Sequence, residues 1–250
     1  MMKRLNTIET IKDRYNPLPE ITAKVFILTV LAFFMSSLVS TLGSIADGFI
    51  IGHTMQTTDI GAMSLTSPIW LIASVITSIL STGSQPLCTL ELGRGNKEKA
   101  VKIFAMTVTA GTGLTLILSV FILLGSGVVC RLLGVAPSMP EYVSCRAYLA
   151  GIAIGLPAMA AGNMISTGVN LEGARRWVMR SAAAITVSNI LLDLLVVLLH
   201  GNLFMMGLTT SFSYYFGMAV YLLYYRRHKD ALLRPYICPV SFSILSSAVM

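Results

Sequence analysis

The sequence predicts an all-α protein that crosses a lipid bilayer six times. Of its 250 residues, 55% are hydrophobic and 12% are charged, and the mean hydropathy is +0.77. This is more apolar surface than one soluble core hides from water. Sixteen of the eighteen Lys and Arg residues fall into four groups, and two apolar stretches separate each group from the next. Three such intervals give six crossings.

The basic groups also predict the orientation. They consist of Lys3, Arg4, Lys12, Arg14 and Lys24; Arg94, Lys97, Lys99 and Lys102; Arg175, Arg176 and Arg180; and Arg226, Arg227, Lys229 and Arg234. Cytoplasmic loops carry the excess of Lys and Arg. We therefore expect a cytoplasmic segment 1–24, a membrane domain 25–227 and a cytoplasmic tail 228–250, in the cytoplasmic membrane.

The first three spans follow from a required length of roughly 20 apolar residues. Val25 to Asp47 follows a charged segment without a signal-peptide cleavage site, so we expect this span to be retained. Ile60 to Gln85 begins after the polar link 53–59, which lacks Lys and Arg and is expected outside. Ile103 to Val129 follows the second basic group. Pro68 in the second span predicts a bend there.

The last three spans are Tyr142 to Val169, Val178 to Leu199 and Phe204 to Tyr225. Pro157 predicts a bend in the fourth span. The fifth and sixth spans are joined by the short turn 200–202, which is expected outside because it carries no Lys or Arg. Both chain ends therefore lie on the same side.

Several function classes are disfavoured. The four cysteines and three histidines are scattered without the spacing of a metal site, and no phosphate-binding glycine loop with its Lys is present. No nucleophile, base or metal constellation indicates an enzyme or a cofactor. The net charge of +7 is spread over loops that face lipid headgroups, which argues against nucleic-acid binding.

Two carboxylates lie at membrane depth, where a charge costs about 2.5 to 3.5 kcal/mol and therefore indicates function. Asp193 stands inside the fifth span, and Asp47 ends the first. Thr186, Asn189 and Asp193 follow helical spacing and share one face. Ser36, Ser40, Ser44 and Asp47 form a similar stripe, although serines in membranes also serve simply as helix-packing or backbone-bonding residues.

A buried carboxyl with amide and hydroxyl neighbours suits the uptake and release of a cation. A bound Na⁺ or proton neutralises the charge that lipid penalises. Hard cations prefer oxygen ligands, which carboxyl, amide and hydroxyl groups supply. Asp47, Asn189 and Asp193 are therefore a candidate Na⁺ or H⁺ site, with exchange against an organic substrate as the expected cycle.

Four segments resemble the multidrug and toxic compound extrusion (MATE) transporters. They are Ser44 to Gly52, Ser64 to Ile69, Leu92 to Asn96 and, most strongly, Asn189 to Asp193, which is similar to the family's Asn-x-x-x-Asp element. The resemblance covers roughly residues 25 to 236. The stretch Met206 to Ser211 departs from a more alanine-rich stretch in the family.

The resemblance implies one six-helix lobe of a twelve-helix, two-lobe transporter, with 228–250 similar to the start of the linker between lobes. It implies that Asp47, Asn163, Asn189, Asp193 and Ser211 surround a cavity, and that cationic or amphipathic compounds are exported in exchange for Na⁺ or H⁺. The second lobe would be a separate half or a second copy. Two alternatives stay open: a flippase for lipid-linked saccharides, and a truncated product that does not transport.

Overall fold

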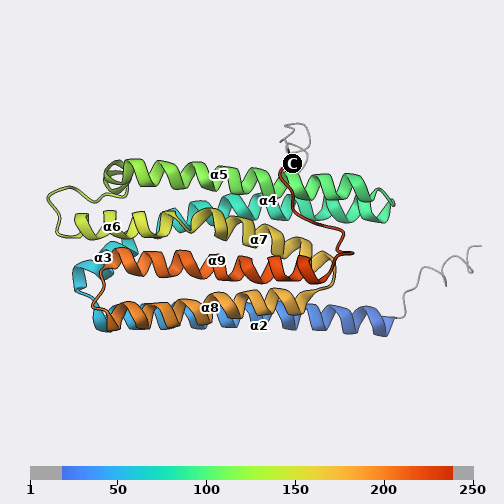
Figure 1. Cartoon of the computed structure of the whole chain (residues 1–250), viewed down its shortest axis with the longest axis horizontal. Coiled ribbons are helices and arrows are strands. Elements are labelled where there is room, and N and C mark those ends of the chain that lie inside the picture. The colour runs from blue at the N-terminus through green and yellow to red at the C-terminus, as the bar shows by residue number, and fades with distance from the viewer. Residues whose placement is uncertain (1–18, 239–250) are drawn as a thin grey trace, which may run out of the picture.

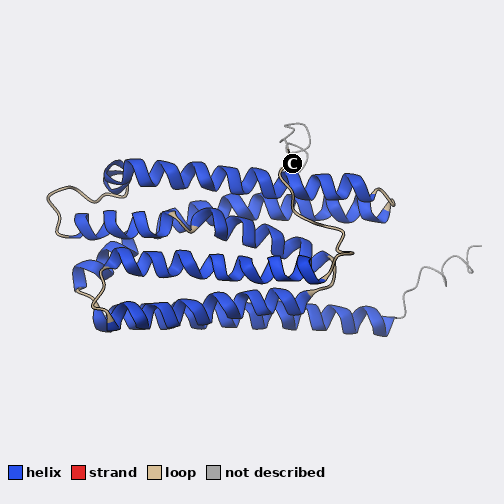
Figure 2. Ribbon diagram, viewed as in Figure 1, coloured by secondary structure: helices blue, strands red, loops and turns tan. Residues whose placement is uncertain are grey.

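The computed structural model describes residues 19–238 and shows a bundle of helices aligned along one long axis (Figure 1). No strand occurs in that range (Figure 2). The helices are α2 (Pro19–Thr54), α3 (Thr57–Leu65), α4 (Ser67–Gly93), α5 (Lys97–Leu132), α6 (Glu141–Ala153), α7 (Leu156–Leu171), α8 (Arg175–Leu198) and α9 (Leu203–Arg227). The expected segment 1–24 lies largely outside the described residues, as do positions 239–250 of the tail.

The first helix is longer than the span predicted from the sequence. It continues past Asp47 to Thr54, because polar side chains of the expected link bond carbonyls of the last turns. Thr54 Oγ1 donates to the Ile50 carbonyl at 2.6 Å, and His53 Nδ1 lies 3.0 Å from the Phe49 carbonyl. Asp47 therefore lies within the helix and not at its end.

Two of the spans are broken helices, near the prolines that predicted bends. The second span divides into α3 and α4 at Thr66, and Pro68 occupies the first turn of α4. The fourth span divides into α6 and α7 with a bend of 43° at Ile154 and Gly155, and Pro157 lies in the first turn of α7. Proline has no N–H to donate and fits a helix start.

Glycine permits a close contact between α6 and α9. A Cβ atom added at Gly151 of α6 would lie 2.5 Å from the Phe204 carbonyl oxygen of α9 and 2.9 Å from Gly207 Cα. Small residues allow backbones to approach in this way, which membrane helices use for packing. This contact fixes α9 against α6 and so sets the position of the hydroxyl groups along α9.

Length and apolarity mark three helical stretches of the described chain as able to cross a membrane: Thr57–Gly93, Lys97–Leu132 and Arg175–Leu198. The bent pair α6–α7 makes a fourth when it is counted as one span. Helix α9 is not among them, since its serines, threonines and tyrosines lower its hydropathy. Those same residues supply polar groups to the interior of the bundle.

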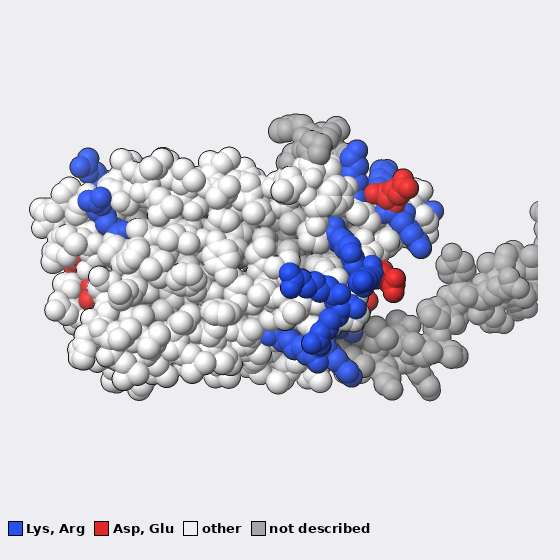
Figure 3. All heavy atoms as spheres, viewed as in Figure 1, with Lys and Arg blue, Asp and Glu red and all other residues white. Residues whose placement is uncertain are grey.

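The surface of the bundle separates apolar flanks from a basic end (Figure 3). Large apolar side chains face outward along the helices; Leu124, for example, is 85% exposed and Ile117 is 68% exposed. Most of the described basic residues gather at one end of the long axis, from the loop after α4, the start of α5, the start of α8 and the end of α9, and a smaller basic group lies at the other end (Figure 3). Water does not tolerate so large an apolar surface, whereas lipid does. The fold is an all-α, polytopic membrane lobe.

Candidate functional site

Asp193 is the centre of the polar interior. It lies on α8, its exposed fraction is 0%, and neighbours on α8 and α9 satisfy both carboxylate oxygens. Asn189 Nδ2, one turn earlier, donates to Oδ2 at 2.5 Å, and the hydroxyl of Thr209 on α9 donates to Oδ1. A carboxylate buried at this depth needs such donors, since an unpaired one costs several kcal/mol.

Asn189 extends this network to a second hydroxyl on α9. Its Oδ1 accepts a hydrogen bond from Ser213 Oγ at 3.2 Å, while its Nδ2 donates to Asp193. Because both sides of the amide are in use, Asn189 holds Asp193 in one orientation. The close contact of α8 and α9 along their length makes this possible.

Asp47 approaches Asp193 from α2. The two acidic side chains are neighbours in the interior of the bundle, and Asp47 is half-buried. Two ionised carboxylates at close range repel, so a proton or a cation beside them favours this arrangement. The close approach of α2 to α8 is visible at Gly43, where a Cβ atom would lie 3.0 Å from Thr186 Cγ2.

A cavity of about 290 Å³ opens beside this carboxyl pair. Asp47 and Asn189 line it together with three aromatic side chains, Trp70, Tyr148 and Tyr214. The Trp70 and Tyr214 rings lie 5.8 Å apart, centroid to centroid. Aromatic faces beside a carboxylate provide a surface on which an organic cation binds.

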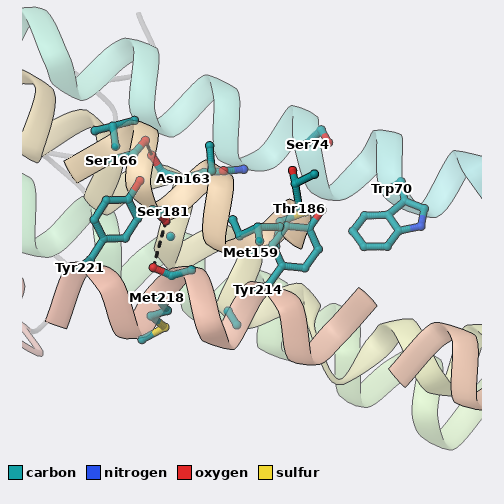
Figure 4. A pocket seen from close by; sticks show the side chains of 16 residues that line it. Trp70, Ser74, Met159, Asn163, Ser166, Ser181, Thr186, Tyr214, Met218 and Tyr221 are labelled. Atoms are coloured by element: carbon teal, nitrogen blue, oxygen red, sulfur yellow. Dashed lines mark hydrogen bonds between the residues drawn. The ribbon is translucent and has the colours of Figure 1, made fainter. Parts of the chain in front are cut away.

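A second cavity of about 340 Å³ adjoins the first and shares Trp70, Ile185, Thr186 and Tyr214 with it. Asn163 and Ser166 of α7 and Ser181 of α8 line this cavity (Figure 4). Ser181 Oγ donates to the Gly217 carbonyl at 2.9 Å, the bond drawn in Figure 4. Neither cavity has a Lys or Arg among its described lining residues.

The structure brings four of the five predicted residues around these two adjoining cavities. Asp47, Asn189 and Asp193 form one cluster, and Asn163 lines the second cavity. Ser211 is placed elsewhere, because its hydroxyl donates to the Gly151 carbonyl of α6 at 2.7 Å and lies against that helix. The side chains of Ser36 and Ser40 in the predicted stripe lie outside the described residues, and Ser44 lines the first cavity.

Sequence reasoning did not identify Thr209, Ser213 or the aromatic wall. Thr209 and Ser213 are four residues apart and so lie on one face of α9, the same signal that identified Asn189 and Asp193 on α8. Trp70 and Tyr148 lie alone in apolar segments, where their side chains look like ordinary core residues. Only the three-dimensional structure, in which the Trp70 ring lies beside Tyr214 of α9 and α6 packs on α9, shows that they line a cavity.

The fold and the cavity together define a polytopic helical membrane protein with an acidic site between its helices. Residues 32–195, well over half of the chain, match the family model MatE. The chain therefore belongs to the MatE family of transporters, whose members are not, in general, enzymes. No curated protein matches the chain in a sequence comparison.

Solved structures of MATE transporters share the fold at low sequence identity. The Vibrio cholerae MATE transporter VcmN in the bent form is 14% identical, with a TM-score of 0.77 over 91% of this chain and 51% of that one. An outward-facing MATE transporter of the MOP superfamily is 20% identical, with a TM-score of 0.70 over 88% and 49%. An inward-facing one is 15% identical, with 0.73 over 88% and 51%. The chain thus spans about half the length of the solved structures that it matches.

Proposed function

We propose that this lobe exports organic cations or amphipathic compounds in exchange for H⁺ or Na⁺, and that Asp47 and Asp193 carry the exchange. The observation behind the proposal is a pair of neighbouring acidic side chains in the polar interior, where the described donors to Asp193 are neutral and the described lining of the adjacent cavity has no Lys or Arg. An entering organic cation replaces the proton as the group that compensates the charge. Because the organic cation and the proton or Na⁺ compete for one pair of carboxyls, export of the cation is coupled to uptake of the ion.

The surroundings of the pair support a cationic substrate. Trp70, Tyr148 and Tyr214 offer aromatic faces beside the carboxyls, and among the described lining residues no basic group competes with the substrate. A flippase for phosphate-bearing saccharides would need Arg or Lys in this place. Asn163, in the adjoining cavity, is positioned to contact the remainder of a substrate larger than the first cavity.

The hydrogen bonds suit a proton in the arrangement described. Asn189 turns its N–H toward Asp193 and its oxygen toward Ser213. Na⁺ would require the amide oxygen of Asn189 beside Asp47 and Asp193, so the amide must rotate for Na⁺ to bind. We infer that Na⁺ and H⁺ select different orientations of Asn189.

We also infer the setting of this lobe in the cell. The basic end of the bundle faces the cytoplasm by the rule for Lys and Arg, with both ends of the chain on that side. We propose that segments 1–24 and 228–250 flank the membrane domain 25–227. The coverage of half of each matched transporter supports a second lobe, supplied by a separate half or by a second copy.

Efflux of a fluorescent organic cation from cells that express this 250-residue chain tests the proposal. Asp193→Asn keeps the size of the side chain and removes its charge, so efflux should fall to the level of cells without the protein. The matched control is Glu98→Gln, the same change of acid to amide at an exposed position of α5. Normal efflux by a well-expressed Asp193→Asn variant would refute the role of the carboxyl pair.

Binding to the purified lobe gives a second readout that does not need a complete transport cycle. Tetraphenylphosphonium should bind the unaltered protein and the Glu98→Gln variant, and lowering the pH should displace it. Displacement by Na⁺ at constant pH would identify Na⁺ as the coupling ion, and its absence would identify H⁺. Equal binding by Asp193→Asn contradicts the proposal.

A further inference from the structure

A third cavity, separate from the two described above, lies at the basic end of the bundle, away from the carboxyl pair. The start of α8 and the end of α9 enclose about 800 Å³ there. Its walls combine four arginines with one imidazole and one indole ring: Arg175, Arg176, Arg180, Arg227, His228 and Trp177. Nothing in the proposed transport cycle uses these residues.

The positive charge of this cavity is not neutralised within the described part of the chain. Among the side chains that the structure describes, the ion pairs are those of Glu91 with Arg94 and Lys99, so none of the four cavity arginines has a described carboxylate within 4.0 Å. Trp177 positions two of them, since the guanidinium carbon of Arg180 lies 4.8 Å from a ring centroid and that of Arg227 lies 5.8 Å away. Stacking leaves the edge N–H donors of a guanidinium available for an anion.

An apolar groove continues from this cavity along the bundle. It has a volume of about 370 Å³ and lies between α2 and α8, with Met35, Val39 and Ala183 in its walls. Arg176, Met179 and Arg180 line both the groove and the basic cavity, so the two are continuous. At about 1.5 Å per residue, α8 advances roughly 12 Å from Arg175 to Ala183. The groove thus leads from the charged end toward the apolar flank.

We propose that this composite site binds an anionic phospholipid. Arg175, Arg176 and Arg180 hold the headgroup phosphate by charge-assisted hydrogen bonds. One acyl chain lies in the groove against Met35, Val39 and Ala183. The ligand needs an anionic head and an apolar chain at adjacent positions, and among ligands at a membrane surface an anionic phospholipid has both.

The position of the site gives the lipid a structural consequence. The groove lies between α2 and α8, the helices that carry Asp47 and Asp193. A lipid seated there packs against both helices and so stabilises their contact. Binding of the lipid does not depend on the proposed transport, because it rests only on the charge and shape of this end of the bundle.

Quenching of Trp177 by brominated lipids measures this binding directly. The chain has two tryptophans, so a Trp70→Phe background leaves Trp177 as the single emitter. The protein is reconstituted in vesicles of phosphatidylcholine that contain either phosphatidylglycerol or phosphatidylcholine brominated on the acyl chains. We expect stronger quenching by the anionic lipid at equal mole fraction.

Two variants separate a built site from general surface charge. Arg176→Gln with Arg180→Gln should lower the preference for the anionic lipid by about twenty-five-fold, at roughly fivefold per basic residue. Lys97→Gln with Lys102→Gln removes the same charge from exposed positions at the same end and should leave the preference unchanged. Equal quenching by both lipids, or an equal loss in both double variants, would overturn the proposal.

The groove and the source of the phosphate are tested separately. Ala183→Phe fills the groove and should reduce quenching by brominated phosphatidylglycerol without any change of charge. Soluble glycerol phosphate lacks the chain and should not reverse the quenching at concentrations that match the lipid. If glycerol phosphate competes as well as the lipid does, the site binds free phosphate groups and the lipid proposal fails.

Discussion

Two buried carboxylates of this bundle are compensated in opposite ways. Glu91, in the last turn of α4 at the basic end of the bundle, is 5% exposed and receives hydrogen bonds from Lys99 Nζ at 2.9 Å, Asn96 Nδ2 at 3.0 Å and Arg94 Nη1 at 3.4 Å. Asp193 receives neutral donors only, from Asn189 and Thr209, and faces a second carboxyl. Glu91 therefore has cations of the protein itself beside it, and Asp193 has none among its described partners.

Under the proposed function, the difference separates a structural charge from an exchangeable one. The cations beside Glu91 belong to the chain and cannot leave, so that carboxylate ties the loop between α4 and α5 to the bundle. In the proposed exchange, Asp193 and Asp47 are compensated by a proton or cation from outside the chain, which can leave. Buried charge alone does not indicate transport; buried charge without a built-in counterion does.

The largest expected effect is on the binding of an organic cation. Asp193→Asn should weaken tetraphenylphosphonium binding to the purified lobe by about a hundredfold or more, since one charge contact is worth about 4 kcal/mol at 4 Å and an effective dielectric constant near 20. Glu91→Gln should leave the affinity unchanged. Isothermal titration of the two variants checks the contrast, and similar losses in both would remove the distinction between the carboxylates.

The next largest effect is on the free energy of unfolding, when the hydroxyl that donates to Asp193 is removed. Thr209→Val replaces the hydroxyl that donates to Asp193 with a methyl group of similar size and should cost about 1.5 to 3 kcal/mol, the range for hydrogen bonds to charged groups. Thr210→Val is the control, because the Thr210 hydroxyl donates to the Met206 carbonyl at 3.2 Å and not to a carboxylate. Thermal denaturation in detergent compares them, and a larger loss for Thr210→Val would contradict the role of the Thr209 hydroxyl.

The two carboxylates also differ in how far the sequence predicts them. Asp193 and Asn189 are predictable, because a polar stripe in a long apolar helix is costly against lipid and so must face the interior of the bundle. Glu91 is not: its place beside a basic loop suggests a solvated carboxylate, whereas the structure buries it under Arg94 and Lys99. That burial depends on how the chain turns at Gly95, whose φ is +82°, a conformation that spacing alone does not predict.

The same limit applies to the rest of the fold and site. Hydropathy and charge predict six spans and one basic end, because both are properties of the chain read in order. They do not predict that Ser211 bonds α6 while Ser213, two residues later, reaches Asn189. Which face of α9 meets α8 depends on the contact of Gly151 with α9, which only three-dimensional packing reveals.

A smaller effect is expected from Glu91→Gln on stability. The substitution leaves Arg94 and Lys99 without their carboxylate, so the melting temperature should fall while efflux stays at the level of the unaltered protein. Asp193→Asn should have the opposite profile, with lost efflux and an unchanged or raised melting temperature, because it removes a buried charge that lacks a counterion. Melting temperature and efflux are measured on both variants. The expectation is that Glu91→Gln lowers only the melting temperature and Asp193→Asn lowers only efflux.

The smallest effect is expected from Lys99→Gln. Arg94 and Asn96 still donate to Glu91 in this variant, and the Lys99 side chain is 60% exposed, so its ion pair is largely screened by water. The melting temperature should fall slightly at about 10 mM ionic strength and match the unaltered protein at about 1 M, where the screening length is about 3 Å. A loss that persists in high salt would show that Lys99 acts through packing and that Glu91 depends on it more than on Arg94.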